Sequence, residues 1–127
     1  MGGVKSFKKY YILKAPPEDV YKALTNPLTL QLWTGEDAIM STEPESEFSL
    51  WEGSIVGKNL SFVENSTIVQ QWYFGEAEPS VVTIKLHPHK LGTSVELRHE
   101  GIPDEAYDDL VDGWDTVYFA SLQEFYD

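Results

Sequence analysis

Gln70 and His99 are the polar side chains best suited to orient a bound molecule, since each interrupts an otherwise apolar strand face. Two-residue alternation predicts Gln70 beside Trp72 and Phe74, and His99 beside Leu97. A buried amide or imidazole that lacks a hydrogen bond destabilises a protein by ~1–3 kcal/mol. Two interpretations follow. Each residue is either satisfied inside the core or near a strand end, or it anchors a ligand in a cavity.

Catalytic and metal chemistry find little support in the residue types. His99 and Tyr118 are the one pair that could exchange protons in a cyclase-type enzyme. The chain has no cysteine, and it lacks a glycine-rich phosphate loop and a serine in a nucleophile elbow. His87 and His89 flank Pro88 without a third ligand nearby, which predicts a turn. We therefore expect a protein that is not an enzyme, with no catalytic residue, metal or cofactor.

The charge of the chain narrows its possible partners. Its net charge is −12, from 21 acidic against nine basic residues, so we expect neither nucleic acid nor membrane as a partner. This acidity serves solubility, or it forms a patch that meets a basic partner. The cluster Asp104, Glu105, Asp108, Asp109 and Asp112 lacks the spacing of a calcium loop and suits a solvated helix face. No signal segment or bilayer-spanning run is present, which predicts a cytoplasmic protein.

The 127 residues suit a single domain over 1–127, and the aromatic share of 13% indicates a core with large side chains or a lined cavity. Pro17 begins a short helix that ends near Thr25, and Asn26 with Pro27 begins a second. Gly57 indicates a bulge or bend within its strand. The remaining elements are strands at Lys5–Lys14, Glu36–Ser41, Glu47–Trp51, Ser54–Val63, Thr67–Phe74, Ser80–Leu86 and Thr93–Glu100, with a loop at Gly75–Pro79 and a turn at Pro88–Gly92.

A long amphipathic helix closes the chain. Gly101–Pro103 breaks the preceding strand, Asp104 caps the helix, and apolar residues recur at helical spacing as far as Phe125. Gly113 interrupts this helix at up to ~1 kcal/mol, which indicates a close approach or a bend. The predicted fold is α+β: a curved antiparallel sheet of about six to seven strands, two short helices after the first strand, and this helix across the sheet.

The space between a curved sheet and its covering helix is the expected ligand site. The same side chains could instead be plain core. The predicted cavity residues are Trp33, Met40, Phe48, Leu50, Gln70, Trp72, Phe74, Val82, Ile84, Leu97, His99, Trp114 and Tyr118.

Several segments lie in the order and spacing of a known family. The chain resembles the Bet v 1-like, START-like helix-grip superfamily (SRPBCC), and within it the C-terminal domain of the activator of the heat-shock-protein-90 ATPase. The segments that carry this resemblance are 15–25, Trp33 after Asn26-Pro27, Phe48–Gly53 with Ile55–Gly57, Ile68–Phe74, Gly92-Thr93, and Gly101–Pro103 leading to Gly113-Trp114.

The resemblance implies a helix-grip fold and three hypotheses for function. The first is a binding domain whose apolar cavity takes a small hydrophobic ligand. The second is a co-chaperone-like interaction module that contacts a heat-shock-protein-90-type chaperone. The third is a cyclase-type enzyme, as in some helix-grip relatives. The eukaryotic co-chaperones carry a separate N-terminal domain, whereas only a few residues precede the first strand here, as in stand-alone bacterial members.

Overall fold

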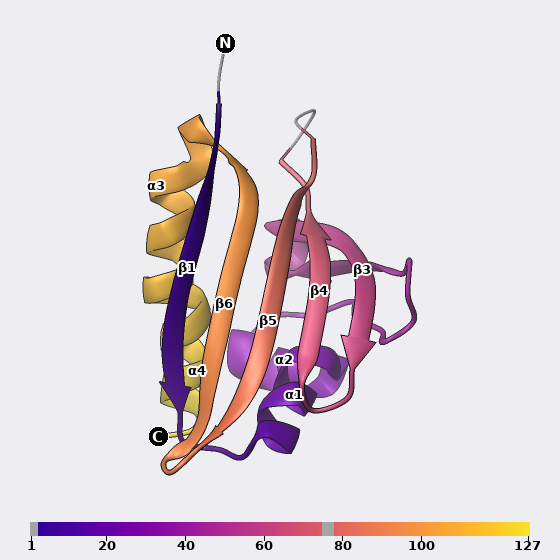
Figure 1. The fold of residues 1–127 in the computed structure, drawn as a ribbon. Helices are drawn as coiled ribbons and strands as arrows, with labels where there is room; N and C mark the ends of the chain where they lie inside the picture. Colours follow the sequence, from indigo (N-terminus) through magenta and orange to yellow (C-terminus); the bar gives the residue numbers. More distant parts are fainter. Residues whose placement is uncertain (1–2, 75–77) are drawn as a thin grey trace.

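The protein is described by a computed structural model that covers residues 3–74 and 78–127. Six strands form one antiparallel sheet in the order β1-β6-β5-β4-β3-β2, and every helix lies behind the same face of it (Figure 1). The strands are β1 (Val4–Leu13), β2 (Glu47–Leu50), β3 (Ile55–Val63), β4 (Thr67–Trp72), β5 (Ser80–His89) and β6 (Gly92–Pro103). The predicted α+β fold, with a curved antiparallel sheet and two short helices after the first strand, is confirmed.

The first and last strands of the chain are neighbours in the sheet. β1 pairs with β6 from Leu13 opposite Thr93 to Val4 opposite Pro103, with one register shift between Lys5 and Phe7. The four other pairings join strands that follow one another in sequence, as a meander requires. The last strand therefore pairs with the first, which lies at one edge of the sheet.

Two short helices connect β1 to β2 and cover one end of the sheet. They are α1 (Pro17–Thr25) and α2 (Pro27–Thr34), and both begin with proline as predicted. The side chain of Asn26 accepts hydrogen bonds from the backbone N–H groups of Leu28 (2.9 Å) and Thr29 (3.2 Å). These bonds satisfy two of the backbone donors that every helix start leaves unpaired.

The C-terminal helix is one continuous segment with a wider winding in its middle. It consists of α3 (Asp104–Gly113), a π-helical turn η2 (Trp114–Tyr118) and α4 (Phe119–Phe125), which together lie behind β1 and β6 (Figure 1). Gly113 keeps an ordinary helical φ of −62°, and no heavy atom would lie within 4 Å of an added Cβ. Of the two alternatives for Gly113, a close approach is therefore wrong, and the helix changes its winding directly after this residue.

Gly57 is required by close packing, and the predicted bulge lies elsewhere. A Cβ at position 57 would collide with the backbone oxygen of Gln71 and lie 2.8 Å from the Phe48 ring. The register shift of β3 falls between Asn59 and Ser61. Glycine at position 57 thus lets β3 pass under Phe48 without a side chain in the way.

Other boundaries also differ from the sequence prediction. The segment Glu36–Ser41 forms only an isolated bridge between Ile39 and Ser49, because no further ladder bonds extend it. β4 ends at Trp72, and β5 runs through Pro88 to His89, so the turn at 88–92 shrinks to residues 90 and 91. Of the predicted loop 75–79, residues 75–77 lie outside the described residues.

The strand break and the helix cap predicted before the last helix are wrong. β6 continues to Pro103 because Val4 and Lys5 of β1 pair with Pro103 and Ile102. Asp104 is the first helical residue, and its carboxylate accepts the N–H of Gly3 at 3.1 Å instead of capping the helix. None of the helices within residues 3–74 and 78–127 has the length and apolar composition that crossing a bilayer requires.

Candidate functional site

A groove with a volume of about 450 Å³ opens between the start of β3, the end of β4 and the middle of the C-terminal helix. Its walls come from three parts of the chain: the turn after β2, the strand ends, and α3 with η2. The lining residues are Trp51, Ser54, Ile55, Val56, Trp72, Tyr73, Phe74, Asp109, Leu110, Gly113, Trp114, Val117 and Tyr118.

Four of the predicted cavity residues line this groove: Trp72, Phe74, Trp114 and Tyr118. The other nine are buried in the interior and do not line it, and their contact with a ligand stays a prediction. Side chains of the sheet and of the C-terminal helix pack directly on one another, for example where Tyr11 of β1 stacks on Phe119 of α4 with ring centroids 4.0 Å apart. These nine residues are Trp33, Met40, Phe48, Leu50, Gln70, Val82, Ile84, Leu97 and His99.

His99 belongs to a hydrogen-bonded chain under the groove. The indole Nε1 of Trp114 donates to Nδ1 of His99 at 3.1 Å, so Nδ1 carries no proton and Nε2 carries it. Nε2 then donates to Ser80 Oγ at 2.7 Å, and Ser80 donates to the backbone oxygen of Trp72 at 3.1 Å. Burial lowers the pKa of His99 to about 3, which keeps the ring neutral.

Gln70 belongs to a second chain of buried hydrogen bonds. Its side-chain oxygen accepts from Trp72 Nε1, and its amide donates to Asn59 Oδ1, both at 3.0 Å. Asn59 in turn donates to the backbone oxygen of Ser41 at 3.0 Å. Throughout the described residues, every buried side-chain nitrogen or oxygen has a partner. Gln70 and His99 are therefore satisfied within the core, the first of the two interpretations.

Asn59 is a structural residue that sequence reasoning missed. It is fully buried, and its partners come from β4 and from the loop before β2. The available signal was its position two residues after Gly57, on the face of β3 that Gly57 shares with the core. A polar residue at such a position requires buried partners.

Tyr118 lines the groove with a largely buried ring. Among residues 3–74 and 78–127, none makes a hydrogen bond with its hydroxyl. The ring lies 4.6 Å from Trp114 and 5.9 Å from Trp51, and burial raises the pKa of the phenol above its usual value. Tyr118 does not bond His99, whose two nitrogens are taken, so the geometry lends no support to an acid–base pair.

Trp51 is one of the nine groove residues that the predicted cavity set did not contain. The turn Trp51–Gly53 follows β2, and φ is positive at all three residues: 50° at Trp51, 54° at Glu52 and 92° at Gly53. Left-handed backbone at two non-glycine residues stores strain of order 1–3 kcal/mol each. This turn holds the half-buried indole edge-on to Trp33 at 5.6 Å, where it forms one wall of the groove.

The helical wall of the groove combines apolar and acidic groups. Leu110 and Val117 present apolar surface, Gly113 leaves the floor between them open, and Asp109 adds a carboxylate. The π-helical turn begins directly after Gly113, and such turns occur often at functional sites. The arrangement can hold an apolar group against aromatic rings with a negative charge at its rim.

The comparisons with known proteins agree with this architecture. The family model for activator of Hsp90 ATPase homolog 1-like proteins matches residues 14–127. This chain belongs to that family. The resemblance drawn from the sequence segments is thereby confirmed.

Two curated relatives and one solved structure illustrate the family. An activator of 90 kDa heat shock protein ATPase homolog from Dictyostelium discoideum is 32% identical over 114 residues, which cover 87% of this chain and 30% of the relative. An uncharacterised protein from Schizosaccharomyces pombe is 34% identical over 119 residues, covering 91% and 33%. The crystal structure of an HSP90 activator from Plasmodium falciparum superposes with a TM-score of 0.87 at 25% identity, covering 97% and 96%.

The chain thus spans about a third of the length of these curated relatives. The family members named here are described as activators or as uncharacterised, which agrees with a binding role.

Proposed function

We propose that this chain is a non-enzymatic binding domain that contacts an Hsp90-type chaperone. The observation that carries the proposal is the family match over residues 14–127, joined to the superposition on an HSP90 activator. Because one fold serves many functions, the proposal needs a direct measurement of binding.

The test uses the purified chain and a purified Hsp90. Binding is measured by isothermal titration calorimetry, with and without a non-hydrolysable ATP analogue, and the chaperone's ATPase rate is measured with rising amounts of the chain. We expect saturable binding and a change in the ATPase rate that saturates at the same concentration. Absence of binding in every nucleotide state would overturn the proposal.

A small hydrophobic ligand in the groove is the second candidate function. Its support is the groove volume of about 450 Å³, which falls within the roughly 300–1,000 Å³ typical of ligand pockets. Aromatic walls would bury the ligand, and the Tyr118 hydroxyl would bond its polar group.

The four tryptophans provide an internal control for this candidate. Trp51, Trp72 and Trp114 line the groove, whereas Trp33 does not and donates its indole N–H to the backbone oxygen of Ala23 at 2.7 Å. Indole N–H resonances are followed by NMR during titration with fatty acids, sterols and aromatic compounds. Groove binding predicts shifts at the three lining tryptophans that exceed those at Trp33. Equal shifts at all four would argue against this site.

A further inference from the structure

The groove lies beside a row of acidic side chains on α3. Glu105, Asp109 and Asp112 are exposed and spaced four and three residues apart, so they line up along one side of the helix. Asp109 also lines the groove itself. The acidic row and the apolar groove are therefore parts of one continuous surface.

No described lysine, arginine or histidine forms an ion pair with this acidic row, although Lys5 lies over the ring of Tyr107 on the same helix, 5.0 Å from its centroid. The C-terminal segment 104–127 contains eight acidic residues and no lysine, arginine or histidine. The ion pairs of this segment are Asp115 with Lys9 at 2.8 Å and Asp127 with Lys14 at 3.1 Å, and neither involves the row. Its carboxylates are free to attract a cation from outside.

We infer that the groove and the acidic row together dock a segment of a partner polypeptide that carries a large apolar side chain next to lysine or arginine. The inference rests on the proposed role as a binding domain and names the chemistry of the partner segment. The apolar side chain enters between Trp51, Leu110 and Val117, and the cations lie along Glu105, Asp109 and Asp112. Charge complementarity selects this occupant, because a neutral apolar ligand would leave the row unused.

The dimensions also favour a polypeptide. Glu105 and Asp112 are seven positions apart, which corresponds to about 10 Å along a helix. Extended chain advances about 3.3 Å per residue, so about three residues are needed to span the row. A segment of that length can place one side chain in the groove and its neighbours on the carboxylates.

Gly113 gives a way to close the groove with little strain. An added Cβ meets no heavy atom within 4 Å, and φ is −62°, so Gly113→Leu fills the floor and favours the helix. Trp51→Ala removes the opposite wall and serves as a second variant should the leucine disturb the fold. Thermal melts and far-UV circular dichroism verify that each variant is folded.

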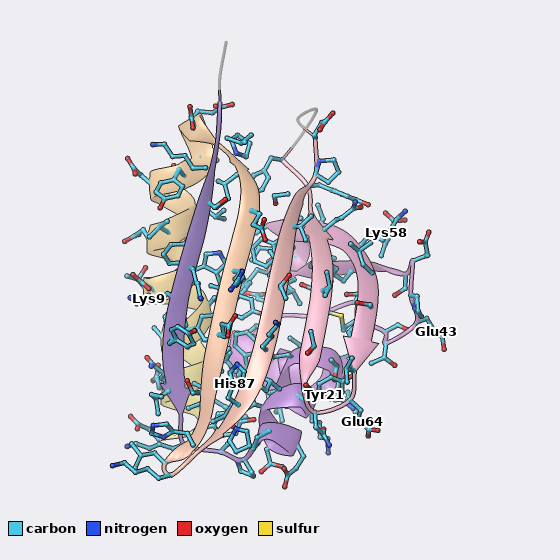
Figure 2. All side chains as sticks on the ribbon, viewed as in Figure 1. Lys9, Tyr21, Glu43, Lys58, Glu64 and His87 are labelled. Carbon is cyan, nitrogen blue, oxygen red and sulfur yellow. The ribbon has the colours of Figure 1, made fainter. Side chains whose placement is uncertain are left out.

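The probes are two synthetic peptides of opposite charge, acetyl-KLWKLK-amide and acetyl-ELWELE-amide, in which every lysine of the first is a glutamate in the second. The acidic row is neutralised by Asp109→Asn with Asp112→Asn. The matched control changes the net charge equally by Glu43→Gln with Glu64→Gln, which lie across the width of the sheet from α3 (Figures 1 and 2). Affinities are measured by fluorescence anisotropy at low and high salt.

We expect the cationic peptide to bind the wild-type chain and the anionic peptide not to bind. Gly113→Leu and the Asp109/Asp112 pair each weaken binding roughly tenfold, and the control pair changes it little. The inference is overturned by equal binding of both peptides, by an unchanged affinity of Gly113→Leu and Trp51→Ala, or by a control pair as damaging as the row. It also fails if neither peptide binds while a small apolar compound does.

The same variants are then titrated with Hsp90, which separates the two proposals. If Hsp90 binds the wild type and the groove variants alike, docking in the groove is wrong while chaperone binding stands. If the cationic peptide behaves as expected and Hsp90 does not bind, the chaperone proposal is wrong while the docking site stands.

Discussion

The indole of Trp114 donates a hydrogen bond to His99 across 3.1 Å, which joins the C-terminal helix to β6 directly below the groove. The two aromatic rings meet edge-on, and Trp72 stacks on Trp114 at 4.6 Å. The part of the groove that Trp72 and Trp114 form is therefore held by a hydrogen bond as well as by packing. Loss of the Trp114 indole N–H alone should therefore weaken the contact between the C-terminal helix and β6.

Trp114→Phe should lower the free energy of unfolding by about 1–3 kcal/mol, because Nδ1 of His99 loses its only described donor while buried. Trp51→Phe is the matched control, since no described residue accepts a hydrogen bond from the Trp51 indole. It should destabilise the chain by less. Urea denaturation measures both, and equal losses would contradict a specific role for the Trp114–His99 bond.

Stability should fall as pH falls from about 6.5 toward 3 because of His99. Burial lowers the pKa of His99 from 6.5 to about 3, so in this window the unfolded chain binds a proton that the folded chain does not. The loss at pH 4 is on the order of 3 kcal/mol, and the contribution is fully present above pH 6.5.

His99→Gln should flatten this pH dependence, because it removes the buried imidazole. NMR of the His99 ring offers a readout that does not depend on a folded variant. A ring that titrates near pH 6 in the wild-type chain would contradict the prediction.

Two glycines should respond to alanine with opposite signs. Gly57→Ala should destabilise the chain by about 1–3 kcal/mol or more, because the methyl group would collide with the backbone of Gln71 and the Phe48 ring. Gly113→Ala should stabilise it by up to about 1 kcal/mol, because the site is open and helical. Thermal unfolding compares the two, and a destabilised Gly113→Ala would show that the π-helical turn needs glycine.

The contact of Asp115 with β1 should depend more on Tyr11 than on Lys9. The Tyr11 hydroxyl donates to Asp115 at 2.6 Å from a largely buried ring, whereas Lys9 pairs with the same oxygen at 2.8 Å in solvent. Both bonds hold the pKa of Asp115 below its usual value. Tyr11→Phe keeps the stacking on Phe119 and should lower the free energy of unfolding by about 1–2 kcal/mol.

Lys9→Gln should lower it by less than about 1 kcal/mol, since exposed ion pairs contribute little. Chemical denaturation at low and high salt measures both substitutions. A larger loss from Lys9→Gln would reverse the predicted order.

The sequence predicted the elements whose signals are local. Pro17, Asn26 and Pro27 set the helix starts through rules that depend on a few neighbouring residues, and strand alternation correctly put Gln70 and His99 inside. Short turns between alternating segments predicted an antiparallel sheet, and the helical spacing after Asp104 predicted the helix that covers it. Helix starts and the inward face of a strand depend on residues that are close together in the sequence, which is why the sequence predicts them.

The groove could not be placed from the sequence because its position depends on backbone geometry. The left-handed turn that directs Trp51 carries no glycine until Gly53, so residue type alone did not reveal the direction of that indole. Glycine within a strand predicts a bulge when only the local sequence is considered. The actual reason for Gly57 is the backbone of Gln71 on the neighbouring strand, a contact that the local sequence does not contain. The strand at Gly101–Pro103 continues only because the start of β1 is available to pair with it.

The pairing of β1 with β6 has a consequence for how the chain reaches this fold during synthesis. Leu13 pairs with Thr93, which is synthesised 80 residues later. β1 therefore has no partner strand until β6 has left the ribosome. Contacts this distant in sequence slow folding. The unpaired β1 carries positive charges at Lys5, Lys8 and Lys9. Such charges on a strand edge disfavour pairing with other chains and so disfavour aggregation.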